Sequence, residues 1–82
     1  MQGQPSSLME ILARKAGCIT LSDLRYLSPK ERKQLARGIE SLRSMDFSLR
    51  EWNDALHYVV RAPEAPSVWE ARARLIEYLD PT

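Results

Sequence analysis

The stretch FSLREWNDALHYVV, residues 47–60, has the strongest amphipathic pattern in the chain, because its apolar residues follow the period of an α-helix. Apolar side chains at spacings of 3, 4 and 3 lie on one side of such a helix, and these are Leu49, Trp52, Leu56 and Val59. Ser48 stands at the N-cap position, and Phe47 before it is placed to pack against Trp52 across the cap. The stretch therefore predicts an amphipathic helix that buries one face.

The cap of this helix repeats a pattern that occurs five times in the chain. Ser or Thr followed three residues later by Glu or Asp satisfies free amide groups at a helix N-terminus. The five pairs are Ser7 with Glu10, Thr20 with Asp23, Ser28 with Glu31, Ser48 with Glu51, and Ser67 with Glu70. Each pair precedes apolar residues at helical spacing, so we predict five helices.

The predicted helices cover residues 8–16, 21–27, 29–45, 49–60 and 68–79. Gly17 is expected to end the first helix in a left-handed cap, and Ile19 to pack against Leu24 across the next cap. A β-strand at residues 18–21 is the alternative there. Gly38, inside the third helix, indicates that a neighbouring backbone packs closely there, and the alternative is that the helix simply tolerates a glycine. Two prolines make residues 61–66 a connecting loop.

One core is all that 82 residues allow, and an apolar fraction of 44% is enough to form it. We predict an all-α fold, a compact orthogonal bundle of about five short helices. Residues 1–5 are expected to form a flexible tail and residues 6–80 a single domain. The expected core is Leu8, Ile11, Leu12, Leu21, Leu24, Leu27, Leu35, Ile39, Leu42, Leu49, Trp52, Leu56, Val59, Val68, Leu75, Ile76 and Leu79.

Residues 8–44 place three helices in sequence through tight turns, which suits a helix-turn-helix-like arrangement. The side of the third helix that is not buried, together with Arg25 of the second, gives a candidate basic face for DNA or an acidic protein. Its residues are Arg25, Lys30, Lys33, Gln34 and Arg37. Residues 1–43 carry net charge +4 and residues 44–82 carry −3. A total of only +1, with Glu31 and Glu40 on the same helix, counts against DNA.

The aromatic residues give a competing signal, because a domain this small cannot cover all of them. Tyr58, Trp69 and Tyr78 are candidate interface residues for a protein partner or a homodimer. The sequence thus leaves open whether the partner is a protein or DNA.

An enzyme or a metal site finds little support in the sequence. His57 is the only histidine and is expected at an exposed edge, and Cys18 is the only cysteine and is expected to be a small buried residue. We expect no cofactor, no metal and no membrane contact, and a cytoplasmic location. The expected function is that of a non-enzymatic regulatory or adaptor protein acting through protein–protein interaction. The alternative is a small DNA-binding transcriptional regulator.

Overall fold

The computed structural model describes residues 7–18 and 20–81, and every regular element in these ranges is helical. Four α-helices form the fold: α1 (Leu8–Ala16), α2 (Pro29–Glu40), α3 (Leu49–Val60) and α4 (Val68–Leu79). Two 3₁₀ helices, η1 (Leu21–Arg25) and η2 (Ser44–Asp46), lie between them. The predicted all-α class is confirmed, and the strand alternative at residues 18–21 is wrong for the part of that segment that is described.

All five predicted helix starts are helix starts in the structure. Serine hydroxyls cap the four α-helices by accepting hydrogen bonds from the amide of the residue three positions later, at 3.1–3.3 Å: Ser7, Ser28, Ser48 and Ser67. At η1 the Thr20 N–H donates to Asp23 Oδ2 at 3.2 Å. The caps therefore set the helix starts that the sequence indicated.

The prediction of five α-helices is wrong at residues 21–27, where the structure has the five-residue 3₁₀ helix η1. Its turn closes between residues three apart, with the Tyr26 N–H donating to the Asp23 carbonyl at 3.1 Å. Ser28 is already extended (φ −71°, ψ 163°) because it precedes Pro29 and caps α2. α1, η1 and α2 still follow the order of the predicted helix-turn-helix-like arrangement.

The predicted extension of the third helix to residue 45 is also wrong, because α2 ends at Glu40. The Ser41 hydroxyl donates to the Gly38 carbonyl at 2.7 Å, and the Leu42 N–H donates to the Ile39 carbonyl at 2.9 Å, which tightens the last turn. The Arg72 guanidinium of α4 then donates to the carbonyls of Glu40 and Leu42, both at 2.9 Å. A longer α-helix would need the Glu40 carbonyl for its own hydrogen bond.

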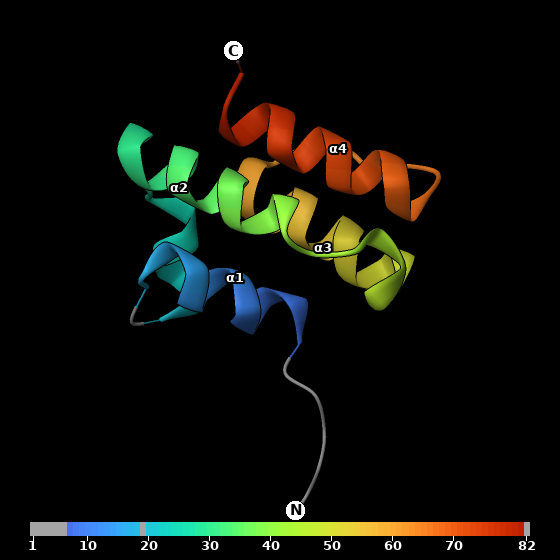
Figure 1. Ribbon diagram of the computed structural model, residues 1–82, viewed down its shortest axis with the longest axis horizontal. Coiled ribbons are helices and arrows are strands. Elements are labelled where there is room, and N and C mark those ends of the chain that lie inside the picture. Colours follow the sequence, from blue (N-terminus) through green and yellow to red (C-terminus); the bar gives the residue numbers. More distant parts are fainter. Residues whose placement is uncertain (1–6, 19, 82) are drawn as a thin grey trace, which may run out of the picture.

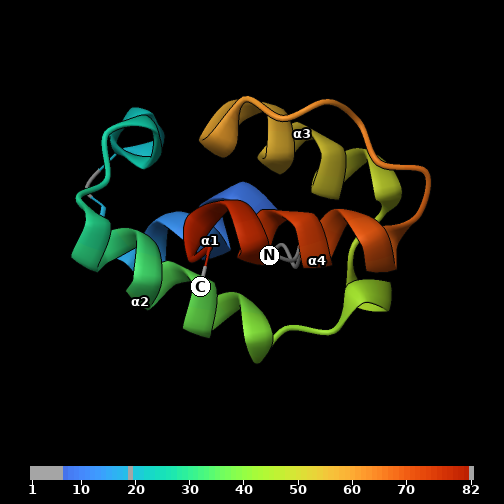
Figure 2. The ribbon, with the colours of Figure 1, turned by 90° about the horizontal axis from the view of Figure 1, so that it is seen from above.

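The helices pack so that α4 lies between α2 and α3 (Figure 2), and α1 contacts α2 and α3 from the other side of the core. Figure 1 shows α3 and α4 side by side and α1 near the start of the described chain. The largest fully buried side chains are Trp52, Leu8, Leu12, Leu24, Leu35, Ile39, Leu56 and Leu75. Most of the predicted core is therefore confirmed.

Some expected core residues are only half-buried: Ile11, Leu27, Leu42, Leu49, Val68 and Ile76. The core also contains alanines that the prediction did not include: Ala13, Ala16, Ala36, Ala55, Ala62, Ala65 and Ala71. Small side chains let short helices approach each other closely. The Ile19 contact, the Leu21 side chain and the predicted tail at residues 1–5 lie outside what the structure describes.

The predicted role of Gly17 is confirmed, whereas at Gly38 the close neighbour is the Lys15 side chain and not the neighbouring backbone that was expected. Gly17 ends α1 in the left-handed region (φ 74°), and the Cys18 N–H donates to the Ala13 carbonyl at 2.8 Å. At Gly38, α1 approaches so closely that a methyl group would lie 2.8 Å from Lys15 Cδ. The Phe47 and Trp52 rings meet edge to face, with centroids 5.8 Å apart, as the cap pattern predicted.

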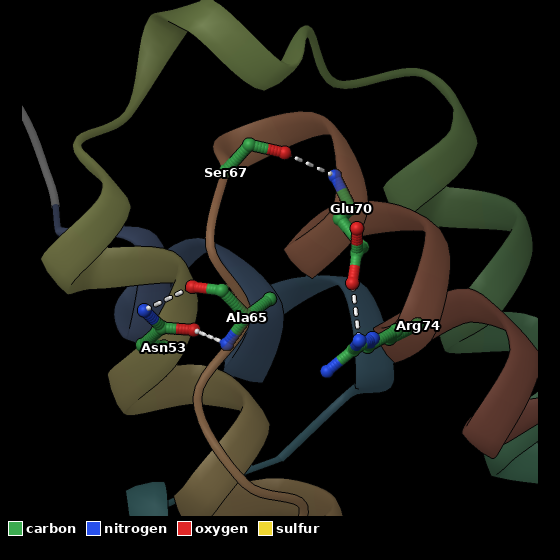
Figure 3. A network of polar contacts seen from close by, with 5 residues as sticks. All are labelled: Asn53, Ala65, Ser67, Glu70 and Arg74. Atoms are coloured by element: carbon green, nitrogen blue, oxygen red, sulfur yellow. Dashed lines mark hydrogen bonds and ion pairs between the residues drawn. The ribbon is translucent and has the colours of Figure 1, made fainter.

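The predicted loop between α3 and α4 is held to the core by one buried side chain (Figure 3). Asn53 Oδ1 accepts from the Ala65 N–H at 2.7 Å, and Asn53 Nδ2 donates to the Ala65 carbonyl at 3.1 Å. Ser67 then caps α4, whose first turns also carry the Glu70–Arg74 ion pair. The loop therefore gives α4 a fixed starting point.

Candidate interaction surfaces

The outer face of α2 brings together four of the five predicted basic-face residues. Lys30, Lys33, Gln34 and Arg37 are exposed and line one shallow hollow. We call this set the α2 strip. It faces away from the core because Leu35, Ala36 and Ile39 occupy the opposite side of the helix.

The cations of the α2 strip have no carboxylate within ion-pair distance among the described residues, where Glu70 and Arg74 form the ion pair that is present. Glu31 lies on the same helix, but its carboxylate accepts a hydrogen bond from the Ser28 N–H at 2.9 Å. That backbone bond, with the Ser28 hydroxyl, holds the pKa of Glu31 below its ordinary value. The positive charge of the strip therefore remains available to a partner.

Arg25, the fifth predicted basic residue, is engaged elsewhere. Its guanidinium lies over the Tyr58 ring, 5.3 Å from the centroid, where η1 meets α3. Tyr58, one of the three predicted interface aromatics, is half-buried and packs against the core. Arg25 thus lies over one face of the Tyr58 ring while it stays exposed.

Trp69, on the first turn of α4, is the most exposed of the three predicted aromatics, with 62% of its surface accessible. It lines a groove with Met45 of η2, which is 76% exposed. The other lining residues come from the end of α2, its connection to α3, and α4: Glu40, Ser41, Leu42, Arg43, Ser44, Asp46 and Arg72. We call this the Trp69 groove.

Arg72 lines the Trp69 groove and holds the segment that forms one of its walls. Its two hydrogen bonds to the end of α2 fix the α2–η2 connection against α4. η2 is held from the core side as well, because Trp52 Nε1 donates to the Ser44 carbonyl at 2.8 Å. The exposed Met45 is therefore carried on a segment that is anchored at two points.

Tyr78, near the end of α4, is 46% exposed and lines a second hollow of about 480 Å³. Apolar residues form most of its wall, and the full lining is Leu27, Pro29, Arg32, Lys33, Tyr78, Leu79, Asp80 and Pro81. Arg32 Nη2 donates to the Tyr78 carbonyl at 2.9 Å and joins the start of α2 to the end of α4. We call this the Tyr78 hollow. It shares Lys33 with the α2 strip.

Sequence reasoning did not single out two exposed apolar residues, Met45 and Tyr26. Tyr26 is 78% exposed and lines a hollow with Cys18, Asp23 and Glu31. The sequence predicts Met45 at the end of a long third helix. Because α2 ends at Glu40, Met45 lies instead in η2 and lines the Trp69 groove. Tyr26 directly follows η1. The leucines of this segment recur every third residue, and Tyr26 does not fall on that pattern, which could have indicated that it is exposed.

His57 and Cys18 are the only histidine and the only cysteine in the sequence. His57 is exposed, as predicted, whereas Cys18, which was expected to be buried, is only half-buried against the core. Burial, followed by the charges of Asp23 and Glu31, raises the pKa of Cys18, which favours the less reactive thiol. The described part of the chain holds no cluster of three metal-ligating side chains. In the same residues, no helix is long and apolar enough to cross a membrane.

Comparisons of the chain with protein-family models, with curated proteins and with solved structures give no match.

Proposed function

We propose that this protein is a non-enzymatic regulatory or adaptor protein of the cytoplasm that binds a protein partner through the Trp69 groove. The observation that carries the proposal is the joint exposure of Trp69 and Met45 in one groove. Tryptophan and methionine are residue types that protein interfaces favour over the rest of the surface.

The two tryptophans of the chain show why exposure at Trp69 is informative. Trp52 is fully buried, which demonstrates that this core can accommodate an indole ring. Covering the exposed part of Trp69 would remove apolar surface worth about 3 kcal/mol at the usual value per unit area. That is the size of contribution expected from a central anchor in a protein interface.

The rim of the Trp69 groove supports the same interpretation. Arg43, Glu40 and Asp46 are exposed around the two apolar side chains and carry both signs of charge. A polar rim around an apolar centre is the usual arrangement of a protein interface. Mixed charges at a rim orient a partner and raise its association rate more than they raise affinity.

The test places a photoreactive phenylalanine analogue at position 69 or, as a control on the same helix, at the exposed position Glu77. Irradiation of cells that naturally contain the protein should give a discrete protein adduct from position 69 and none from position 77. Because Met45 lines the same groove, the analogue placed at position 45 should give the same adduct. A folded protein that forms no adduct at 69 or 45 would contradict the proposal.

A second candidate function, binding of duplex DNA, is favoured by the α2 strip, whose cations have no ion-pair partner among the described residues. Lys30, Lys33 and Arg37 would neutralise phosphates, so affinity should fall steeply with salt. Anisotropy titration of a labelled 20-base-pair duplex measures this directly, and changing the three residues to Glu should abolish binding to all sequences. A salt-insensitive or absent interaction at near-physiological ionic strength eliminates this candidate.

A further inference from the structure

The α2 strip has a spacing that fits a regular row of negative charges. Lys30, Lys33 and Arg37 are separated by three and four residues, so they occupy successive turns on one face of α2. At a rise of 1.5 Å per residue, they span about 10 Å along the helix axis. Carboxylates three and four residues apart on a helical peptide present the same spacing, and no carboxylate of the described chain neutralises the strip.

The Tyr78 hollow extends this charged row into an apolar site. Lys33 belongs to both surfaces, so the hollow begins where the strip reaches the side of α2 that faces α4. Leu27, Pro29 and Tyr78 offer apolar contact beside that lysine. Arg32 is already bonded to the Tyr78 carbonyl and fixes the wall, which leaves Lys33 as the cation at the entrance.

We infer that the α2 strip and the Tyr78 hollow together bind an acidic amphipathic peptide segment of a protein partner. Carboxylates of the segment pair with Lys30, Lys33 and Arg37, and one large apolar side chain of the segment enters the hollow beside Tyr78. The inference rests on the proposed function in one respect, since it assumes a protein partner. It adds a second contact site and the chemistry of the segment that occupies it.

The surroundings of the strip favour a peptide over duplex DNA. Glu40 is exposed on α2 one turn beyond Arg37, and Asp80 lines the Tyr78 hollow. A helix placed in the major groove has phosphates along both edges, and these carboxylates would repel phosphates beside them. A peptide carries charge only at the positions that its own sequence provides, so it can match three cations and avoid the flanking acids.

The experiment selects random 14-residue peptides displayed on phage against the intact protein, then measures the recovered peptides by fluorescence anisotropy. The strip variant changes Lys30, Lys33 and Arg37 to Gln. The matched control changes Arg14, Arg50 and Arg61 to Gln, because these exposed arginines lie outside the strip and give the same change in net charge. Tyr78→Ser tests the hollow, and circular dichroism verifies that each variant is folded.

The recovered peptides should be enriched in Asp and Glu and should contain a large apolar residue. Their affinity should fall about tenfold in the strip variant, as expected for three exposed ion pairs, and less than about twofold in the control. Tyr78→Ser should weaken the binding of the same peptides without changing how their affinity depends on salt concentration.

Recovery of no peptide, of peptides without acidic enrichment, or of peptides that bind the strip variant equally well would overturn the inference. A 20-base-pair duplex that binds the protein more tightly than the peptides would assign the strip to nucleic acid and would also overturn it. The proposed function is tested separately by crosslinking at Trp69. An adduct at position 69 without strip-dependent peptides would retain the proposed function and reject this second site.

Discussion

At the scale of single residues, Trp52 combines burial in the core with contacts to two neighbouring segments. It is fully buried, meets Phe47 edge to face, and donates a hydrogen bond to the Ser44 carbonyl. Trp52→Ala should lower the free energy of unfolding by roughly 3 to 5 kcal/mol, because it leaves a cavity and an unpaired carbonyl. Urea denaturation measures the loss. Trp69→Ala is the control and should change stability by less than about 0.5 kcal/mol; equal losses would mean that Trp69 is structural.

Glu31 makes the free energy of unfolding depend on pH in the acidic range. Its pKa in the folded protein is depressed by the hydrogen bonds from Ser28, so its ionised form stabilises α2 above the ordinary value of 4.5. That stabilisation is lost as the pH falls through the lower folded-state pKa. Glu31→Gln should therefore flatten the decrease in unfolding free energy below pH 4.5, measured by denaturation at several pH values. Identical pH profiles for the two proteins would show that the bond does not persist in solution.

At the scale of helices, Arg72 joins the end of α2 to α4 and lines the Trp69 groove. Its planar guanidinium donates to two carbonyls at once, a geometry that lysine cannot reproduce. Arg72→Lys should lower stability by about 1 kcal/mol and Arg72→Ala by about 2, since carbonyls at a helix end lose their donors. Arg74→Lys is the control, because Arg74 pairs with Glu70 within α4. A larger loss in the control would contradict this role for Arg72.

The same helix shows what the sequence could and could not predict. The start of α2 follows from Ser28, Pro29 and Glu31, which are close in sequence and act on each other. Its end depends on Arg72, thirty residues away from the carbonyl of Leu42, and local patterns carry no record of such a contact. The candidate surfaces divide in the same way: the α2 strip follows from helical spacing, whereas Met45 joins Trp69 only through tertiary packing.

At the scale of the whole molecule, the core is continuous across all four α-helices, so no part of it should unfold alone. Thermal unfolding followed by helical circular dichroism and by the fluorescence of Trp52 should give one transition with the same midpoint. The measurement is made on the Trp69→Phe variant, which lacks the exposed indole, so that the tryptophan emission comes from the buried Trp52 alone. Two separated midpoints would instead show that one helix detaches before the rest.

The buried pair of bonds between Asn53 and Ala65 has a consequence for the exchange of amide hydrogen with solvent. Residues 61–67 contain no regular structure, and exchange in an exposed segment of this kind is normally complete within the first measurement. The Ala65 amide, however, donates to a side chain that is itself buried within α3. We expect its deuterium uptake to be as slow as that of the α3 amides, while the Glu64 amide beside it exchanges rapidly. Asn53→Ala should bring the two rates together, so this one loop amide would report the opening of the domain interior.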